Sequence, residues 1–295
     1  MAAAVWLSGC SSPSGPSGGG PPNGGGVVPP PNRGGPNVLV GAGDIANCDS
    51  PGDEATARLL DTIEGTVFTA GDNAYMNGSS AQFRDCYNPG WGKHRDRTYP
   101  TPGNHDYETS NATGYYDYFG SRAGPRNGGY YAYDVANWRV YALNSEFDKV
   151  PNLAQMQMDW LKSEFASRPA PCSIAIWHKP LYTSGPNGEN PHMRDIFKLL
   201  YDNGVDVVLN GHDHIYERFA PQDANGRLDP ARGIRQFTVG TGGVATYTNP
   251  RVAQNSEKIF SVWGVLMLTL NSNSYEWEFI SVDPGFRDTG SGSCH

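Results

Sequence analysis

Residues 205–214 read VDVVLNGHDH, and this stretch decides how the rest of the chain is interpreted. Its first half is a short apolar run rich in β-branched residues, which predicts a buried strand. Histidines two residues apart on a regular strand face opposite sides, but a turn after glycine can bring both rings toward one point. The stretch therefore predicts a metal site at the end of a strand, with an ordinary polar loop as the alternative.

Residue types that bind metals also lie at the ends of other apolar runs and in other glycine-containing loops of the chain. Any one of these residues alone could be a turn residue or a hydrogen-bonded side chain, but six in this arrangement favour a common site. Carboxylates, an amide oxygen and imidazoles suit borderline or hard divalent and trivalent ions rather than a thiolate site. The six candidate ligands are Asp44, Asp72, Asn104, His178, His212 and His214.

The order of elements predicts the fold class. Helical spacing covers residues 53–64, 112–119, 152–166 and 192–203, and strand patterns cover 38–42, 66–70, 130–135, 138–144, 173–177, 205–209, 235–240, 261–270 and 275–282. Strands and helices alternate early, and strands dominate late. This order favours an α/β fold of two packed mixed β-sheets flanked by helices, an αββα sandwich, over a single doubly wound sheet. We expect one folded domain over residues 37–295.

The N-terminal region predicts export. Residues 1–10 form a short, weakly apolar segment whose Leu-Ser-Gly-Cys end resembles the lipobox of bacterial lipoproteins, in which Cys10 would carry the lipid. The alternative is an arbitrary run of small residues. Residues 11–36 are mostly Ser, Pro and Gly, which predicts a disordered linker. We therefore expect an extracytoplasmic protein, truncated or atypical in its signal, that is secreted or lipid-anchored to the bacterial cell surface.

Charge and hydropathy limit the partners. The formal net charge of -8 argues against a binder of nucleic-acid polymers, because such proteins need a basic surface to displace phosphate counterions. No run of 18 apolar residues predicts a membrane-spanning helix. The sequence predicts no particular oligomeric state.

Four cysteines remain when Cys10 is set aside, and an even number in an exported chain is compatible with two disulfides. Three connectivities are possible. We favour a bond between Cys48 and Cys86, because both follow loops that we expect on the same face of the domain. We favour a second bond between Cys172 and Cys294, which would attach the C-terminus to a strand.

The chain resembles the calcineurin-like metallophosphoesterases over about residues 38–218. The matching blocks, in order, are Gly43-Asp44, Gly71-Asp72, Gly103-Asn104-His105-Asp106, His178 after a strand, and Gly211-His212-Asp213-His214. Many relatives carry Asp-x-His in the first block, whereas Ala46 stands here. The GDNAY of residues 71–75 and the GHDHIYER of residues 211–218 are similar to purple acid phosphatases, in which the tyrosine is a ligand. The resemblance thus points to that branch, without the additional N-terminal β domain of its plant members.

This resemblance implies a site with two metal ions. Asp72 would bridge them, with Fe(III) at the Tyr75 site and a divalent Fe, Zn or Mn beside it. His105 would donate a proton to the leaving alkoxide or bind the phosphate, and Asp106 could orient His105 or raise its pKa. The first ion would be bound by Asp44, Tyr75 and His214, and the second by Asn104, His178 and His212.

The activity implied by the resemblance is hydrolysis of small phosphate monoesters by a metal-activated hydroxide. The closest alternative is a phosphodiesterase acting on cyclic nucleotides or glycerophosphodiesters, because the same metal pair serves both reactions. A protein that binds metal or phosphate without catalysis is a third interpretation. Asn104, His105 and His192 are the substrate-binding candidates.

Overall fold

The structure, a computed structural model, describes Met1 and residues 33–126, 128–248 and 250–295. The α-helices are α1 (Gly52–Leu60), α2 (Ser80–Gln82), α3 (Thr113–Phe119), α4 (Leu153–Ser167) and α5 (Arg194–Asp202). Other helical segments are η1 (Phe83–Tyr87), η2 (Trp91–Arg97), η3 (Ser110–Ala112), η4 (Gly120–Ala123) and η5 (Pro191–Met193). The strands are β1 (Arg33–Ala42), β2 (Ile63–Ala70), β3 (Thr98–Thr101), β4 (Tyr131–Val135), β5 (Trp138–Ala142), β6 (Ser173–Ile176), β7 (Val207–Asn210), β8 (Tyr216–Phe219), β9 (Arg235–Val239), β10 (Ser256–Phe260), β11 (Gly264–Leu270), β12 (Ser274–Ser281) and β13 (Arg287–Ser293).

The strands form two mixed sheets, which confirms the predicted fold class. A six-stranded sheet has the order β13-β12-β11-β1-β2-β3, and a seven-stranded sheet has the order β10-β8-β9-β7-β6-β5-β4. In the first sheet β1, β2 and β3 are parallel, and in the second sheet β5, β6, β7 and β9 are parallel. The remaining strands pair antiparallel with these or with one another.

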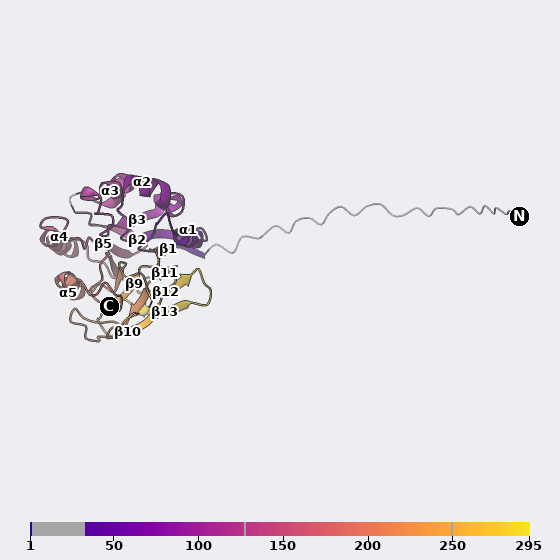
Figure 1. Ribbon diagram of the computed structural model, residues 1–295. Coiled ribbons are helices and arrows are strands. Elements are labelled where there is room, and N and C mark those ends of the chain that lie inside the picture. The colour runs from indigo at the N-terminus through magenta and orange to yellow at the C-terminus, as the bar shows by residue number, and fades with distance from the viewer. Residues whose placement is uncertain (2–32, 127, 249) are drawn as a thin grey trace. The chain divides into compact units, whose positions relative to one another are not determined.

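Alternation along the short buried strands divides the apolar side chains between two layers. Val207 and Leu209 of β7 join the core shared with the other sheet, whereas Val208 joins the core under α4 and α5. Successive side chains of a strand point to opposite faces, so a strand that is buried on both faces must be apolar throughout. Figure 1 shows α4 and α5 on the left of the domain, α2 and α3 next to each other at the top, and α1 at the right beside β1.

The parallel strands bring the predicted ligands to one region. Parallel neighbours end at the same edge of a sheet, and loops that follow their carboxyl ends meet there. Backbone hydrogen bonds continue this pairing past the strands: Asp44 N donates to Gly71 O at 3.1 Å, and Gly211 N donates to His178 O at 3.0 Å. Gly43 N donates to Val239 O at 2.8 Å, which joins the loop ends of the two sheets.

Both predicted disulfides are confirmed. Cys48 is bonded to Cys86 and Cys172 to Cys294, with Cα–Cα distances of 4.9 and 5.4 Å that are ordinary for disulfides. The first bond joins the loop after β1 to the helical segment η1, and the second attaches the end of the chain to the start of β6. The predicted lipid site Cys10 lies outside the described residues, as does most of the predicted linker.

The start of the domain differs from the prediction. The linker was expected to extend to residue 36 and the first helix to residue 64, but β1 already includes Arg33 and β2 already includes Ile63. The two errors have one cause, because Arg33 pairs with Ile63 and Gly34 with Glu64 in the parallel ladder. Backbone pairing with a distant partner stabilises this glycine-rich stretch as a strand, and side-chain periodicity does not reveal it.

Strand β13 was also missed, because its sequence RDTGSGS is rich in glycine and serine. Its glycines lie opposite large rings of β12: Gly290 pairs with Trp277 and Gly292 with Tyr275. A Cβ atom on Gly290 would lie 2.2 Å from the Trp277 ring, so glycine is required by the close approach of an aromatic side chain.

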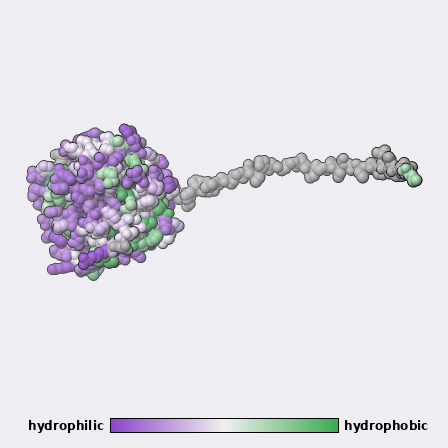
Figure 2. All heavy atoms as spheres, viewed as in Figure 1, coloured by the Kyte–Doolittle hydropathy of each residue, from purple (hydrophilic) through white to green (hydrophobic). Residues whose placement is uncertain are grey.

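The face of the domain seen in Figure 2 is mainly polar. Figure 2 shows one face of the folded domain as mostly hydrophilic, with hydrophobic residues confined to smaller areas. Among the helices of the described residues, none combines the length and the apolar character that crossing a bilayer requires.

Asp106 does not have the predicted role of orienting His105. Its fully buried carboxylate accepts hydrogen bonds from the backbone N–H of Asn73 at 3.2 Å, from the Asn73 side-chain amide at 2.9 Å and from Gly103 N at 2.9 Å. His105 instead bonds Met76 through its ring. Asp106 therefore joins the loop after β2 to the loop after β3. The side chains of His105 and Asp106 are adjacent in sequence but have different partners, because the backbone of the turn donates hydrogen bonds to the Asp106 carboxylate.

Replacement of Asp106 by alanine should destabilise the protein. Each buried donor left without an acceptor costs about 1–3 kcal/mol, so we expect Asp106→Ala to lower the free energy of unfolding by roughly 3 kcal/mol in urea titrations of metal-free protein. Burial, followed by the charge of Asp72, raises the pKa of Asp106 to about 7. Asp106→Asn keeps an acceptor oxygen and removes only a charge that burial already disfavours. It should therefore lower the free energy of unfolding less than Asp106→Ala does. A loss below about 1 kcal/mol for Asp106→Ala would contradict this bracing role.

Candidate metal centre

Three of the predicted ligands have a backbone conformation that is rare for residues with a side chain. The φ angles are 59° at Asp44, 49° at Asp72 and 72° at His212. Non-glycine residues in the left-handed region cost of order 1–3 kcal/mol each and persist only where the surroundings hold them. Each follows a glycine, and the close approach of the loops explains two of these: a Cβ on Gly71 would lie 2.5 Å from the His178 ring, and one on Gly211 would lie 2.4 Å from Ala70 O.

The first group of donor atoms surrounds the hydroxyl of Tyr75, which is buried. This hydroxyl donates to Asp44 Oδ1 at 2.7 Å and lies 3.0 Å from Asp72 Oδ2. It also lies 3.3 Å from His214 Nε2, which in turn is 3.4 Å from Asp44 Oδ1. The phenol, two carboxylates and an imidazole thus converge, and they include the residues that the family resemblance assigns to the first ion.

The second group surrounds Nε2 of His178. This atom lies 3.0 Å from Asp72 Oδ2, 3.1 Å from Asn104 Oδ1 and 3.2 Å from His212 Nδ1. Asp72, His178 and His212 are also a set of side chains able to hold one metal ion. The same oxygen, Asp72 Oδ2, therefore belongs to both groups. The other oxygen, Oδ1, accepts a hydrogen bond from His105 N at 2.8 Å.

Backbone carbonyls fix how the histidines face the centre. His178 Nδ1 bonds Ala70 O at 2.8 Å, and His214 Nδ1 bonds Ala245 O at 2.9 Å. A carbonyl only accepts, so Nδ1 carries the hydrogen in both rings and Nε2 is left to act as the ligand atom. His212 is the exception, because its Nδ1 faces the centre.

The charged side chains of the centre shift one another's pKa values. Burial alone would raise the pKa of Asp72, but the neighbouring His178 outweighs it and holds that pKa far below its usual range. Burial would lower the pKa of His178, but the charge of Asp72 and its hydrogen bond raise it to about 10. Burial and the positive charge of His178 lower the pKa of His212 to about 3. The buried carboxylates thus hold positive charge at their centre.

The donor set fits a pair of hard or borderline metal ions. Ligand atoms about 2.1 Å from one ion lie about 3 Å from one another, which is the spacing within both groups. Burial, followed by the charge of Asp44, raises the pKa of Tyr75 well above its ordinary value, so the free phenol keeps its hydrogen until a cation replaces it. A second cluster of potential ligands in the described residues, Cys172, Asp206 and Cys294, does not qualify, because its two sulfurs form a disulfide.

His105 lies beside both groups without belonging to either. Its Nε2 is 4.0 Å from Asp72 Oδ2, and its side chain is 28% exposed. Its ring nitrogen Nδ1 donates to Met76 O at 2.6 Å, so Nε2 is the nitrogen directed at the centre. The ring also packs against Tyr75, with 4.4 Å between ring centroids.

The predicted substrate-binding residue His192 lies elsewhere. His192 is exposed in η5, and among the described contacts none joins it to the donor groups. The reason is local: the segment beyond residue 190 turns into α5, whose apolar face packs on the seven-stranded sheet. The prediction that His192 binds substrate gains no support from this geometry.

Sequence analysis missed two residues at the rim of the centre. Tyr247, which follows β9, stacks on the ring of His214 with 4.3 Å between centroids. Glu146 is fully buried and pairs with Lys179 Nζ at 2.6 Å, next to His178. The signal for Tyr247 was present, because residues 240–243 read GTGG directly after a strand. Nothing in sequence marks Glu146, whose partner lies far along the chain.

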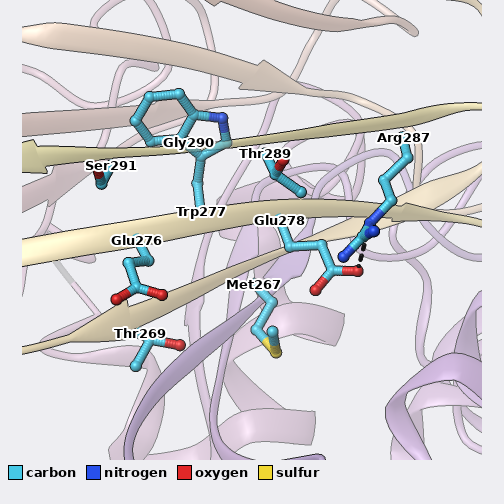
Figure 3. A pocket seen from close by; sticks show the side chains of 9 residues that line it. All are labelled: Met267, Thr269, Glu276, Trp277, Glu278, Arg287, Thr289, Gly290 and Ser291. Carbon is cyan, nitrogen blue, oxygen red and sulfur yellow. Dashed lines mark hydrogen bonds and ion pairs between the residues drawn. The ribbon is translucent and has the colours of Figure 1, made fainter.

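A surface pocket of about 430 Å³ over β11, β12 and β13 belongs to a different part of the domain. Figure 3 shows Glu276 and Glu278 on one side of β12 and Trp277 on the opposite side. Glu278 is neutralised by Arg287 at 3.0 Å and by Arg33 at 2.9 Å. The pocket contains none of the predicted ligands and presents the polar outer surface of a sheet.

Comparisons with known proteins agree with this geometry. In sequence, the chain is 34% identical over 124 residues to purple acid phosphatase 18 of Arabidopsis thaliana, covering 39% of this chain and 26% of that protein. It is 27% identical over 228 residues to purple acid phosphatase 21 of the same plant, covering 68% of this chain and 49% of that protein. The chain thus spans about half, or less, of the length of these curated relatives.

Comparison with solved structures also finds a purple acid phosphatase. The purple acid phosphatase PPD1 from yellow lupin seeds superposes with a TM-score of 0.70 at 20% identity, covering 90% of this chain and 55% of that one. The calcineurin-like phosphoesterase family matches residues 27–216, which is more than half of the 295 residues. The chain therefore belongs to the calcineurin-like phosphoesterase family, and its relatives within that family include purple acid phosphatases.

Proposed function

We propose that this chain is a binuclear metal-dependent hydrolase of small phosphate monoesters. The observation that carries the proposal is the shared oxygen Asp72 Oδ2, 3.0 Å from the Tyr75 hydroxyl in one donor group and 3.0 Å from His178 Nε2 in the other. A carboxylate oxygen common to two groups suits a bridge between two ions. Two bound ions would supply a hydroxide at neutral pH and would neutralise the charge that develops in phosphoryl transfer.

Residues of the chain would donate the proton to the leaving group and orient the phosphate. His105 holds Nε2 toward the centre while Met76 O keeps the hydrogen on Nδ1, so a protonated ring can give the Nε2 proton to the leaving oxygen. Asn104, whose Oδ1 faces His178, would ligate and help to orient the phosphate. Asp106 acts only through the loops that it joins.

We also propose that the protein works outside the cytoplasm. Disulfides persist in oxidising compartments and are rare in the cytosol, and this chain has two. The plant relatives carry the name purple acid phosphatase. Secretion or a lipid anchor at Cys10 follows from the lipobox-like segment. The partners would be small phosphoesters rather than nucleic-acid polymers.

For the ion bound by Asp44, Tyr75 and His214 we propose Fe(III), with divalent Fe, Zn or Mn as its neighbour. A phenolate is a hard anionic ligand, and the two carboxylates beside Tyr75 add the negative charge that favours a trivalent ion. We expect a visible absorption band in the purified protein that Tyr75→Phe abolishes. Colourless protein that contains two zinc or manganese ions would refute iron but not hydrolysis.

The activity is tested with p-nitrophenyl phosphate and bis-p-nitrophenyl phosphate in parallel. We expect faster turnover of the monoester, and His105→Ala should lower that turnover by about 10²- to 10⁴-fold, the range of general acid catalysis, while bound metal stays near two ions per chain. Preference for the diester would favour the phosphodiesterase. Metal-replete protein that binds phosphate but cleaves neither ester would favour a binding protein.

A further inference from the structure

The turn that carries two of the proposed ligands needs support from outside. His212 has a φ angle of 72°, and its backbone N–H donates to Asp44 Oδ2 at 2.8 Å. The strain of this left-handed residue favours other conformations of the turn unless neighbouring groups hold it. Two loops from other parts of the chain, residues 183–187 and residues 245–247, contact all three residues from His212 to His214.

Residues 245–247 hold His214. Ala245 O accepts from the ring nitrogen Nδ1 at 2.9 Å, and Tyr247 N donates to the backbone oxygen of His214 at 3.0 Å. The Tyr247 ring lies parallel to the imidazole, with an interplanar angle of 11°. One loop thus fixes both the backbone and the ring of this ligand.

Residues 183–187 hold the other two members of the turn. Asn187 Nδ2 donates to His212 O at 2.7 Å, and Asn187 N donates to Asp213 Oδ1 at 3.1 Å. The second Asp213 oxygen accepts from the Thr183 hydroxyl at 2.7 Å. Gly185 packs so closely on Asp213 that a Cβ atom there would lie 2.1 Å from the carboxylate. Asp213, which sequence analysis left without a role, is thus the anchor of this loop.

The loop itself is fixed from a second side. Glu217 is fully buried and accepts from Ser184 N at 2.9 Å and from the Ser256 hydroxyl at 2.6 Å. Since Glu217 lies in strand β8, shortly after the turn, these hydrogen bonds connect the loop to the segment that carries the proposed ligands. Asn187 also reaches Tyr247 OH at 3.3 Å, which connects the two supporting loops.

We propose that Asn187 is a positioning residue for the metal centre. Its side-chain amide holds the carbonyl of His212 and so keeps the strained turn in the conformation that presents His212 Nδ1 to the second donor group. The proposal rests on the proposed binuclear site but not on the identity of the substrate. Asn187 is exposed and contributes no ligand atom, so its removal leaves the full donor set in place.

The test measures release of metal rather than hydrolysis. The full chain is loaded with two equivalents of Zn²⁺, and transfer to a chromophoric chelator is followed. Partners that orient ligands are worth about 10- to 100-fold in metal affinity, so Asn187→Ala should release one of the two ions at least about 10-fold faster than wild type. Asn187→Asp has the same size but lacks the NH₂ donor, and it should behave in the same way.

Asn190→Ala is the matched control, since it removes an amide from the same region whose side chain caps no helix. Asn190→Ala should release zinc at a rate within about 2-fold of the wild-type rate. The melting temperatures of the metal-free variants should equal that of metal-free wild type, which separates a loss of positioning from a loss of stability. Equal release from the Asn187 and Asn190 variants would overturn this inference and leave the proposed hydrolase intact. Wild-type protein that retains no zinc, and no iron or manganese when it is loaded with these ions instead, would overturn both.

Discussion

The structure depends on the buried carboxylate of Asp72. One of its oxygens is shared by the two donor groups, and the other is held by the backbone N–H of His105. A buried carboxylate is costly unless positive charge compensates for it, and here the protonated His178 does so while no metal is bound. A bound cation would take over that compensation. The loops around the centre are therefore arranged to gather charge that the protein would otherwise exclude from its interior.

Strained turns after glycine give this arrangement its shape. Asp44, Asp72 and His212 all have left-handed backbones, and the glycine before each lets another loop approach. The cost of these conformations is offset by buried hydrogen bonds between distant parts of the chain, such as those from Asn73 to Asp106 and from Thr183 to Asp213. These two acids resemble the ligands in burial and in position along the sequence, yet they hold loops. The centre thus combines side chains that form the two donor groups with similar side chains that fix the backbone.

This division explains which predictions from sequence succeeded. The strands with apolar runs, the two sheets and both disulfides were predicted, because burial leaves a periodic pattern and because few cysteines allow few pairings. The role of Asp106 was wrong, since adjacency to His105 in sequence says nothing about direction within a turn. Strand β13 was missed because its glycines serve rings on the neighbouring strand. Tyr247 was missed because its contact with His214 joins loops from two strands.

The sequence by itself determined the strand ends that carry ligands, the chemical type of the donors and the order of the blocks that resemble the family. These features are local, since a glycine and a polar residue after an apolar run can be read without any partner. Only the tertiary structure decided which oxygen of Asp72 is shared, which nitrogen of each histidine faces the centre and which loops hold the turn at His212. Those properties depend on contacts between residues far apart in the chain, and each requires the packed sheets to bring its partners together.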